Sequence, residues 1–286
     1  MIQEGKEKLY RFITEALAED VGDGDHTSLS TIPSGKQGKA LLIIKEQGIL
    51  AGVEEALAVF DQVDNTLQVD VLRTDGVSVH KGDIAFRVIG PMRSILLAER
   101  LVLNIMQRMS GIATATHRIV TAMEGTGTKL LDTRKTTPLL RFLEKKAVSI
   151  GGGVNHRFGL YDMILIKDNH VDYAGGISEA VQRANEYRSL LGKPLAIEVE
   201  VRNMDELKEV LNVGHIERIM LDNFTPDQIR EALTLIDGRF VTEASGGITE
   251  ENIRDYADTG VDYISMGALT HSVKSLDMSL KASPLD

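Results

Sequence analysis

The stretch Ile219-Met220-Leu221-Asp222-Asn223 is an apolar run that ends in polar residues, and the same pattern occurs six times beyond Gly127. The other five runs occupy residues 129–132, 163–168, 196–200, 240–245 and 263–267. A helical pattern follows each run; Thr225-Pro226-Asp227-Gln228, for example, has the spacing of a capping box with proline at the first helical position. Strands that alternate with helices predict a parallel sheet with right-handed crossovers.

Each of the six predicted strands carries charged, glycine or serine residues at its carboxyl end. In an α/β barrel these ends converge on one centre, and active sites are built from the residues that follow each strand. An open doubly wound sheet also binds ligands at its strand ends, but it would spread the charged residues along an edge. The pattern therefore favours an α/β barrel, shortened or open because it has six units.

The residues before position 124 follow a different pattern. Short β-like runs at residues 39–50, 66–79 and 83–89 are separated by glycines, and a long helical run repeats apolar residues between Ile95 and Ile112. Residues 1–20 predict an amphipathic helix and contain no signal-peptide pattern. We therefore expect an N-terminal region that is distinct from the barrel.

The composition excludes several classes of protein. The chain has 286 residues, 42 acidic and 32 basic, and its net charge of −10 argues against a nucleic-acid partner. The absence of cysteine excludes disulfides, thiolate zinc sites and cysteine nucleophiles, and it fits a cytoplasmic location. No apolar run approaches the roughly 18 residues that a membrane span needs. Residues 129–170 nevertheless hold eight basic and four acidic residues, a local excess that suits a small polyanionic substrate.

Glycines close the last two predicted strands. Gly246 and Gly247 follow Ser245, Gly267 ends the final run, and residues 249–252 read as the start of a helix. Backbone N–H groups at such glycines and at a helix N-terminus bind phosphate, which barrels often hold after their final strands. Ordinary tight turns remain the alternative explanation for these glycines.

Glu200 and Asp222 end neighbouring predicted strands. Two carboxylates that face one pocket suit Mg²⁺ held partly through water and substrate phosphates, because this ion prefers oxygen ligands. Alternatively, the two carboxylates pair with basic residues nearby. Both arrangements are compatible with a ligand-free protein.

A cluster of cations lies on the first two predicted strands and their connection. The cluster comprises Arg134, Lys135, His156, Arg157 and Lys167. Arginine matches carboxylates through two parallel hydrogen bonds, and several cations in one cleft are costly unless an anion arrives. The glycines at 151–153 indicate a backbone that passes close to another group. A surface salt-bridge network would explain Arg141, and we interpret Lys145 and Lys146 as a solvated basic helix face.

Seven sequence blocks resemble those of the quinolinate phosphoribosyltransferase family, in the family's order and over nearly the whole chain. The blocks are residues 19–27 (EDVGDGDHT), 99–104 (ERLVLN), 132–138 (DTRKTTP), 151–157 (GGGVNHR), 165–170 (LIKDNH), 221–224 (LDNF) and 243–248 (EASGGI). The resemblance implies an N-terminal α/β sandwich domain, residues 1–115 joined by residues 271–286, and an open six-stranded α/β barrel at residues 116–270. It also implies a cytoplasmic homodimer with shared active sites.

The resemblance further implies an activity and a set of site residues. The family transfers phosphoribosyl from phosphoribosyl pyrophosphate to quinolinate with decarboxylation, which gives nicotinate mononucleotide, CO₂ and pyrophosphate for NAD biosynthesis, with Mg²⁺ as cofactor. The residues implied for the quinolinate carboxylates and nearby phosphates are Arg134, Lys135, His156, Arg157 and Lys167. Those implied for the 5′-phosphate are Ser245, Gly246, Gly247 and Gly267. Arg100 would reach the neighbouring subunit's site.

Catalytic roles are implied for Lys135, Lys167, Glu200 and Asp222, the last two also on the ribose and Mg²⁺ side of the site. One residue departs from the family pattern, since Leu139 stands where we expect glycine. It lies in a loop or helix start, so it is expected to alter local flexibility without changing the charged groups.

Three alternatives share parts of these signals. A related phosphoribosyltransferase with another acceptor, such as nicotinate, would keep the phosphate site but need fewer cations. A phosphate-binding isomerase or aldolase barrel would use a Schiff-base lysine, for which Lys167 is the candidate. A non-catalytic ligand-binding protein would bind tightly without turnover.

Overall fold

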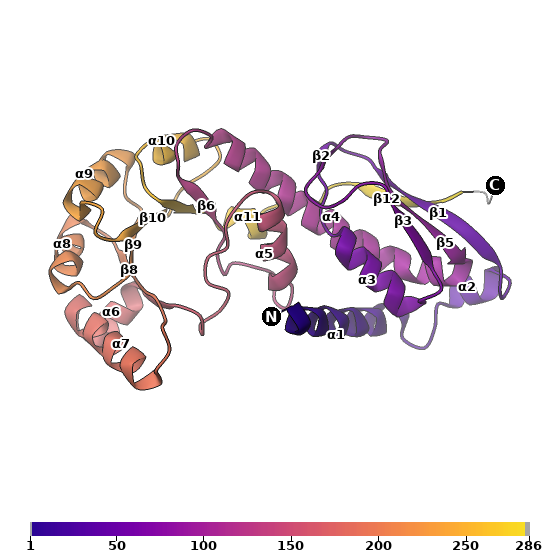
Figure 1. Ribbon diagram of the computed structural model, residues 1–286, viewed down its shortest axis with the longest axis horizontal. Helices are drawn as coiled ribbons and strands as arrows, with labels where there is room; N and C mark the ends of the chain where they lie inside the picture. The colour runs from indigo at the N-terminus through magenta and orange to yellow at the C-terminus, as the bar shows by residue number, and fades with distance from the viewer. Residues whose placement is uncertain (1, 284–286) are drawn as a thin grey trace. The chain divides into compact units, whose positions relative to one another are not determined.

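The computed structural model describes residues 2–283, which divide into two compact units (Figure 1). The first unit comprises the residues up to Ala115 together with those from Val273 onward, and the second comprises Thr116–Ser272. Helix α4 (Met92–Ala122) continues from the first unit into the second. Within residues 2–283, no helix has both the length and the apolar character that crossing a membrane requires.

The first unit is built on an antiparallel sheet with the strand order β12-β1-β5-β3. Its strands are β1 (Gln37–Ile44), β3 (Gln68–Val71), β5 (Ile84–Pro91) and β12 (Met278–Ser283), and β2 (Gly48–Ile49) pairs separately with β4 (Ser78–Val79). Its helices are α1 (Ile2–Val21), α2 (His26–Thr31), α3 (Val53–Val63) and the first part of α4. The chain that follows the second unit thus returns to pair with β1.

One face of this sheet is covered by helices. Every second residue of β1 is buried, and Phe86 of β5 meets Phe60 of α3 edge to face, with ring centroids 5.7 Å apart. The predicted N-terminal helix is α1, although Met1 lies outside the described residues. The predicted run at residues 66–79 splits into β3 and β4, because Gly76 adopts φ +86° in a turn between them.

Six parallel strands form the second unit, in the order β6-β11-β10-β9-β8-β7. The strands are β6 (Lys129–Leu131), β7 (Ile164–Ile166), β8 (Ile197–Val201), β9 (Arg218–Asp222), β10 (Val241–Ser245) and β11 (Tyr263–Ser265). The helices are α5 (Arg141–Ile150), α6 (Asp168–Ala174), α7 (Ile177–Leu191), α8 (Met204–Val213), α9 (Pro226–Ile236), α10 (Ile253–Ala257) and α11 (Ala268–His271). Helices α7, α8 and α9 lie outside the strands (Figure 1), and β6 and β7 are the sheet's two edges. The predicted open six-stranded α/β barrel is confirmed.

The strand register brings the polar carboxyl ends to one level. Glu200 of β8 pairs with Met220 of β9, and Asp222 at the end of β9 pairs with Ser245 of β10. All five residues of β8 are buried, so its two glutamates lie inside the barrel unit rather than on its surface. Residues from separate stretches of sequence therefore meet at the carboxyl edge of the sheet.

Helix starts follow the sequence signals in one case and depart from them in another. Thr225 and Gln228 form the predicted capping box at the start of α9. The helix predicted from Thr249 instead begins at Ile253 and is five residues long. The reason is local: the Asn252 side chain accepts a hydrogen bond from the Thr249 N–H at 2.8 Å, which holds these residues as a turn.

Candidate active site

A pocket of about 220 Å³ opens at the carboxyl ends of the barrel strands. The predicted site residues that line it are Arg134, Lys135, His156, Arg157, Lys167 and Ser245. The wall is completed by Thr133, Leu165, Met220, Glu243 and Ser265. We call this the cation pocket. It gathers residues from six separate stretches of the sequence, as the strand-end pattern predicts.

Three cations of the pocket lack a carboxylate partner. Arg134 and Lys135 follow β6 and are exposed, and Arg157 is half-buried before β7. None of the three forms an ion pair with a residue that the structure describes. Burial lowers the pKa of the Arg157 guanidinium, and the positive charge of Arg134 lowers it further. Like charges held together in this way favour an anionic ligand.

The fourth cation, Lys167, pairs with Glu200. The Lys167 side chain is 42% exposed whereas that of Glu200 is 8% exposed, so the pair runs from the solvent side of the pocket into the barrel. Asp222 ends the next strand, and its carboxylate accepts a hydrogen bond from the Asn223 side chain at 2.6 Å. Glu200 therefore forms the salt bridge that the sequence left open as an alternative.

The predicted phosphate-binding glycines occupy three different settings. Gly246 has φ +87°, and a side chain there would collide with Asn223, so the turn itself requires glycine. Gly247 has φ +64° with open space around it, which leaves its backbone accessible. A Cβ atom at Gly267 would lie 2.8 Å from Cδ of Lys135. This glycine therefore makes room for the stem of a pocket cation.

His156 is buried, and its ring contacts other protein groups. Its Nε2 lies 3.0 Å from a carboxylate oxygen of Glu198 and 3.3 Å from one of Glu243. Its Nδ1 accepts a hydrogen bond from the Arg157 backbone N–H at 2.6 Å. The ring is therefore held from both sides, and only part of it faces the cation pocket. Sequence reasoning found the residue but not these contacts.

The group of His156, Glu198 and Glu243 keeps a proton at neutral pH. Burial opposes the charged ring, but the two carboxylates outweigh it and raise the pKa of His156 to about 9. Burial also raises the pKa of the Glu198 carboxyl. Because Nδ1 accepts the Arg157 N–H, the ring carries its own proton on Nε2, and the further proton that the group retains is shared with the carboxylates, so the titration belongs to the group as a whole.

The same group has the residue types of a metal site, with ligand atoms all within 4.8 Å of one another. A guanidinium nitrogen of Arg218 lies 3.2 Å from Glu243, and another lies 4.0 Å from Glu198. Arg218 and the retained proton already balance the two carboxylates. We therefore interpret the group as a buried charge network beneath the cation pocket, and Glu200 and Asp222 take no part in it.

Two sequence interpretations around α5 are wrong, and the close approach predicted at glycines 151–153 is confirmed. Lys145 is 1% exposed rather than solvated, because it pairs with the buried Asp132 beneath the pocket loops. Arg141 bonds backbone carbonyls and a threonine rather than a surface salt-bridge network. The close approach at glycines 151–153 is to protein, since a Cβ at Gly153 would lie 2.7 Å from Val148 of α5.

Two buried glutamates of the site were not predicted from the sequence. Glu198 and Glu243 each lie two residues before a predicted site residue, Glu200 and Ser245 respectively. Alternate residues of a strand point to the same face, so this spacing was the available signal. Buried strand glutamates are uncommon enough that the pair could have been singled out.

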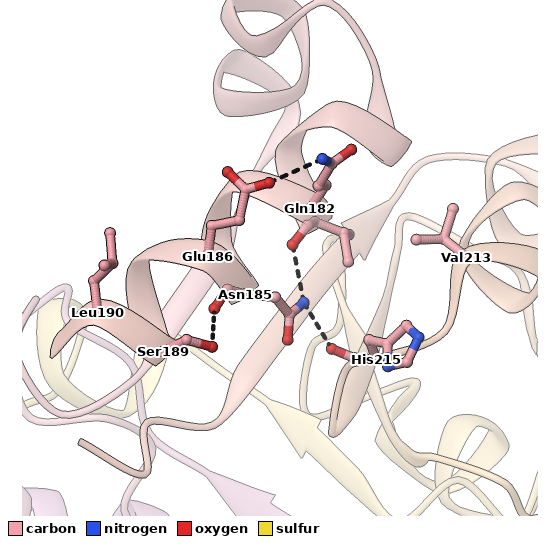
Figure 2. Close-up of a pocket in the computed structure, with 8 residues that line it drawn as sticks. Gln182, Asn185, Glu186, Ser189, Leu190, Val213 and His215 are labelled. Carbon is pink, nitrogen blue, oxygen red and sulfur yellow. Dashed lines mark hydrogen bonds between the residues drawn. The ribbon is translucent and has the colours of Figure 1, made fainter. Parts of the chain in front are cut away.

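Arg100 lies on α4 in the first unit, is exposed, and does not line the cation pocket. A second hollow of about 680 Å³ lies against α7 in the second unit (Figure 2). Its polar groups bond one another: Gln182 with Glu186 at 2.9 Å, and Asn185 with the backbone of His215 at 3.0 Å. It contains no cluster of cations and is larger than the cation pocket, so chemistry rather than size identifies the candidate site.

Family models match both parts of the chain. The model described as "Quinolinate phosphoribosyl transferase, N-terminal domain" matches residues 25–110, and the corresponding C-terminal domain matches residues 112–281. The chain belongs to the quinolinate phosphoribosyltransferase family. This assignment agrees with the resemblance that the seven sequence blocks carry.

Relatives of the family cover nearly the full chain. A Bacillus subtilis protein named "Probable nicotinate-nucleotide pyrophosphorylase [carboxylating]" is 44% identical over 96% of this chain and 93% of its own length. A chloroplastic rice enzyme named nicotinate-nucleotide pyrophosphorylase [carboxylating] is 47% identical over 94% of this chain and 76% of its own. The crystal structure of NadC from Streptococcus pyogenes has a TM-score of 0.91 and 40% identity, covering 96% of each chain.

Proposed function

We propose that the protein transfers a phosphoribosyl group from phosphoribosyl pyrophosphate to quinolinate with decarboxylation, giving nicotinate mononucleotide, CO₂ and pyrophosphate in NAD biosynthesis. The observation that carries the proposal is the cation pocket, where Arg134, Lys135 and Arg157 meet without an ion-pair partner among the described residues. Two carboxylates and several phosphates supply the matching charge. Because the chain belongs to the quinolinate phosphoribosyltransferase family, we assign the carboxylates to quinolinate and the phosphates to phosphoribosyl pyrophosphate.

The two sides of the pocket bind different groups, the quinolinate carboxylates on one side and the 5′-phosphate on the other. Arg134 and Arg157 bind the quinolinate carboxylates, because the planar guanidinium matches a carboxylate through two hydrogen bonds. His156 supports them from below through its contact with the Arg157 backbone. Ser245 and the backbones of Gly246, Gly247 and Gly267 hold the 5′-phosphate. The stem of Lys135 lies against Gly267, so its ammonium links the two sides.

Lys167 changes partner when substrate binds. It moves from Glu200 to the anionic ligand, which frees the Glu200 carboxylate for the ribose. The quinolinate nitrogen then attacks the anomeric carbon while the bond to pyrophosphate breaks, and Glu200 and Asp222 stabilise the positive charge on the ribose ring. The pyridinium so formed lets the neighbouring carboxylate leave as CO₂, and water supplies the proton that replaces it. Positioning and electrostatics, rather than a covalent nucleophile, drive both steps.

Glu200 and Asp222 are the residues that would hold Mg²⁺. They are oxygen donors on neighbouring strands, and no third histidine or acidic residue of the described chain joins them in a ligand group. That donor set fits Mg²⁺, which keeps several waters and uses substrate phosphates. When bound, the ion neutralises the charge of the leaving pyrophosphate.

Asp222→Asn should raise the Mg²⁺ concentration for half-maximal turnover roughly tenfold, because one charged ligand is lost. A Mg²⁺ titration at saturating substrates measures this, and quinolinate affinity, measured by calorimetry, serves as the control. An unchanged Mg²⁺ titration would show that Asp222 does not hold the ion.

A product assay tests the proposed reaction directly. The protein is given Mg²⁺ and phosphoribosyl pyrophosphate with either quinolinate or nicotinate, and both CO₂ and the nucleotide are followed. Release of CO₂ and nicotinate mononucleotide from quinolinate alone is the expected result. Turnover of nicotinate instead would keep the phosphate site and overturn the two-carboxylate assignment, and no turnover with either acceptor would reject the reaction.

We further propose a homodimer in which Arg100 enters the neighbouring subunit's cation pocket. Arg100→Ala and Lys167→Ala should each abolish turnover. Mixing the two after joint refolding should recover about a quarter of wild-type activity, since half of random dimers are hybrids with one intact site. No recovery, or a monomer in light scattering, would reject the shared site.

We also propose a cytoplasmic location, supported by a chain without cysteine. Fractionation of cells that express the tagged chain tests it. Recovery in a membrane or secreted fraction would contradict it.

A further inference from the structure

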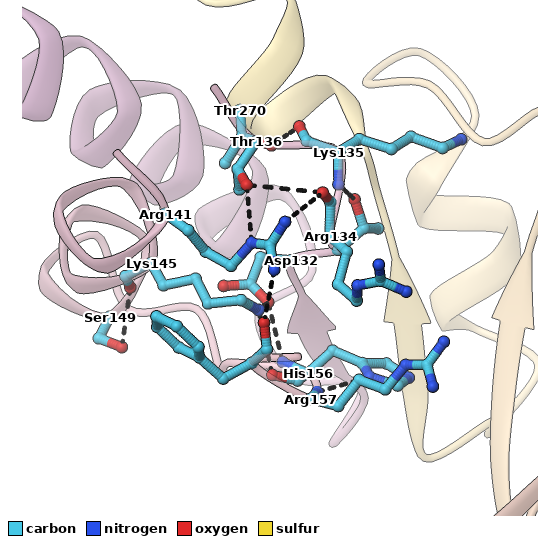
Figure 3. Close-up of polar contacts among 12 residues, drawn as sticks. Asp132, Arg134, Lys135, Thr136, Arg141, Lys145, Ser149, His156, Arg157 and Thr270 are labelled. Atoms are coloured by element: carbon cyan, nitrogen blue, oxygen red, sulfur yellow. Dashed lines mark hydrogen bonds and ion pairs between the residues drawn. The ribbon is translucent and has the colours of Figure 1, made fainter. Parts of the chain in front are cut away.

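One face of α5 bonds both loops that carry the pocket cations (Figure 3). Residues 141, 144 and 145 share this face because they are spaced three and four residues apart. In Figure 3 the side chains of Arg134, Lys135 and Arg157 extend from these loops to the side away from α5. The helix therefore contacts the loops from behind and leaves the ligand-facing groups free.

Arg141 joins the two loops through a single guanidinium. Its Nε donates to the Thr136 hydroxyl at 2.9 Å and its Nη2 donates to the Arg134 carbonyl at 3.4 Å. Its Nη1 donates to the Phe158 carbonyl at 2.9 Å. Thr136 and Arg134 belong to the loop after β6, whereas Phe158 directly follows Arg157 on the other loop. One side chain thus fixes the distance between the backbones that carry Arg134 and Arg157.

Lys145 and Asp132 hold the second loop at His156. The Lys145 ammonium pairs with Asp132 and also donates to the His156 carbonyl at 3.0 Å. The Asp132 carboxylate accepts the His156 backbone N–H at 2.8 Å. Asp132 directly follows β6, so both backbone groups of His156 are tied to the edge strand and to α5. Asp132 and Lys145 are each at most 1% exposed, which keeps water from competing for these bonds.

The buried Glu144 completes the contact. Its carboxylate accepts a hydrogen bond from the Thr137 backbone N–H at 3.1 Å, on the same loop as Arg134. All of these bonds end on backbone atoms, on Thr136 or on Asp132, and none ends on the guanidinium groups of Arg134 or Arg157. The arrangement is that of a support for the loops rather than of a ligand site.

We propose that Arg141 and Lys145 are positioning residues, which hold Arg134 and Arg157 at the spacing that a dicarboxylate ligand needs. The inference rests on the proposed function and extends it to residues outside the pocket. Arg134 and Arg157 repel each other, so loops without this support would separate in the ligand-free protein. Bringing them back together on binding would weaken the affinity for quinolinate, because a preformed site avoids that cost.

Arg141→Met tests the proposal, because this half-buried side chain can be replaced without leaving a buried charge. Quinolinate and phosphoribosyl pyrophosphate affinities are measured by calorimetry, and KM and kcat in the product assay. We expect quinolinate to bind roughly 10- to 100-fold more weakly, as for other misplaced catalytic groups, with a change below about 3-fold for phosphoribosyl pyrophosphate. Arg141→Lys should restore part of the loss.

Arg230→Met is the matched control. Arg230 lies on α9 in the same unit and pairs with Asp227 at 2.7 Å on the surface. It should leave both affinities unchanged. Hydrogen exchange adds a readout that does not depend on turnover: peptides covering residues 133–137 and 155–158 should exchange about tenfold faster in Arg141→Met, while peptides over β9 stay unchanged.

The outcomes separate this proposal from the proposed function. If the wild-type protein turns over quinolinate and Arg141→Met binds it normally, or loses both ligands equally, the positioning role is wrong and the function stands. Unchanged exchange in both loops would also reject the positioning role. If the wild-type protein neither binds nor turns over quinolinate, the proposed function fails and this inference fails with it.

Discussion

The cation pocket has an exposed mouth and a largely buried layer beneath it, and charges are paired differently in the two. The mouth comprises Arg134, Lys135, Arg157 and Lys167; the buried layer, which we call the floor, comprises Asp132, Lys145, His156, Glu198, Glu243 and Arg218. At the floor, Asp132 pairs with Lys145, and the carboxylates of Glu198 and Glu243 face His156 and Arg218. At the mouth, Arg134, Lys135 and Arg157 have no ion-pair partner in the described chain, and only Lys167 pairs with a carboxylate, that of Glu200. The floor charges balance within the protein, whereas the mouth charges need a ligand. The balanced charges therefore stabilise the fold around the pocket, and the unbalanced ones favour an anionic ligand.

The comparison predicts that removing a charged residue affects folding stability in one region and ligand binding in the other. Loss of a floor charge leaves its buried partner uncompensated, which should reduce folding stability. Loss of a mouth cation removes repulsion along with a ligand contact, so binding should suffer while the fold is kept.

Lys145→Met should have the largest effect on stability. It leaves the carboxylate of Asp132 buried without its cation, and breaking a buried pair costs about 3–5 kcal/mol. Urea unfolding of the intact protein measures the loss. The double variant Asp132→Asn, Lys145→Met removes the charge and keeps an oxygen that accepts the His156 N–H, so it should recover part of the stability. Equal losses in the single and double variants would show that the charge of Asp132 is not the cause.

Folding stability should fall as the pH rises toward 9. The group around His156 titrates at about 9 when folded, above the ordinary value of 6.5, so its stabilisation is complete below pH 6.5 and is lost between pH 6.5 and 9. Glu198 and Glu243 face the ring, Arg218 contacts these two carboxylates, and Asp132 accepts the His156 backbone N–H. Losing the proton leaves two buried carboxylates with one arginine, an effect of at most about 3 kcal/mol.

His156→Asn should flatten this pH dependence. The free energy of unfolding, measured in urea from pH 6 to 9.5 for the wild type and the variant, gives the comparison. Equal slopes in the two proteins would show that the group does not keep a proton.

The sequence predicts the barrel and the mouth better than the floor. Strand periodicity and polar strand ends depend on nearby residues, and charged loops such as residues 132–138 are recognisable as motifs. The contact of Lys145 with Asp132 joins a helix to a strand end, and a lysine on an amphipathic helix is usually solvated. The cluster of Glu198, Glu243 and His156 brings together three strands or loops, so only the folded register reveals it. The start of α10 differed because one asparagine favours a turn.

Arg157→Ala should weaken the binding of quinolinate more than the binding of phosphoribosyl pyrophosphate. Its guanidinium faces the pocket without an ion-pair partner in the described chain, and a hydrogen bond to a charged group contributes about 1.5–3 kcal/mol. Quinolinate should therefore bind roughly 10- to 100-fold more weakly, while phosphoribosyl pyrophosphate binding and urea stability change little. Calorimetry with each ligand measures the effect. An equal loss for both ligands would refute the carboxylate assignment.

The smallest effect concerns Leu139, which lies on the exposed part of the Arg134 loop. It is 81% exposed with φ +66°, a conformation that favours glycine, so its side chain gains little packing while its backbone is strained. Leu139→Gly should stabilise the protein by about 1 kcal/mol, because relief of strain exceeds the added freedom of the unfolded chain. Leu160→Gly is the control, since Leu160 is 72% exposed without a positive φ and should gain nothing. Equal urea midpoints for the two variants would show that Leu139 is not strained. A gain at Leu139 alone, with unchanged quinolinate affinity, would show that the backbone of Leu139 is strained and that its side chain does not contribute to quinolinate binding.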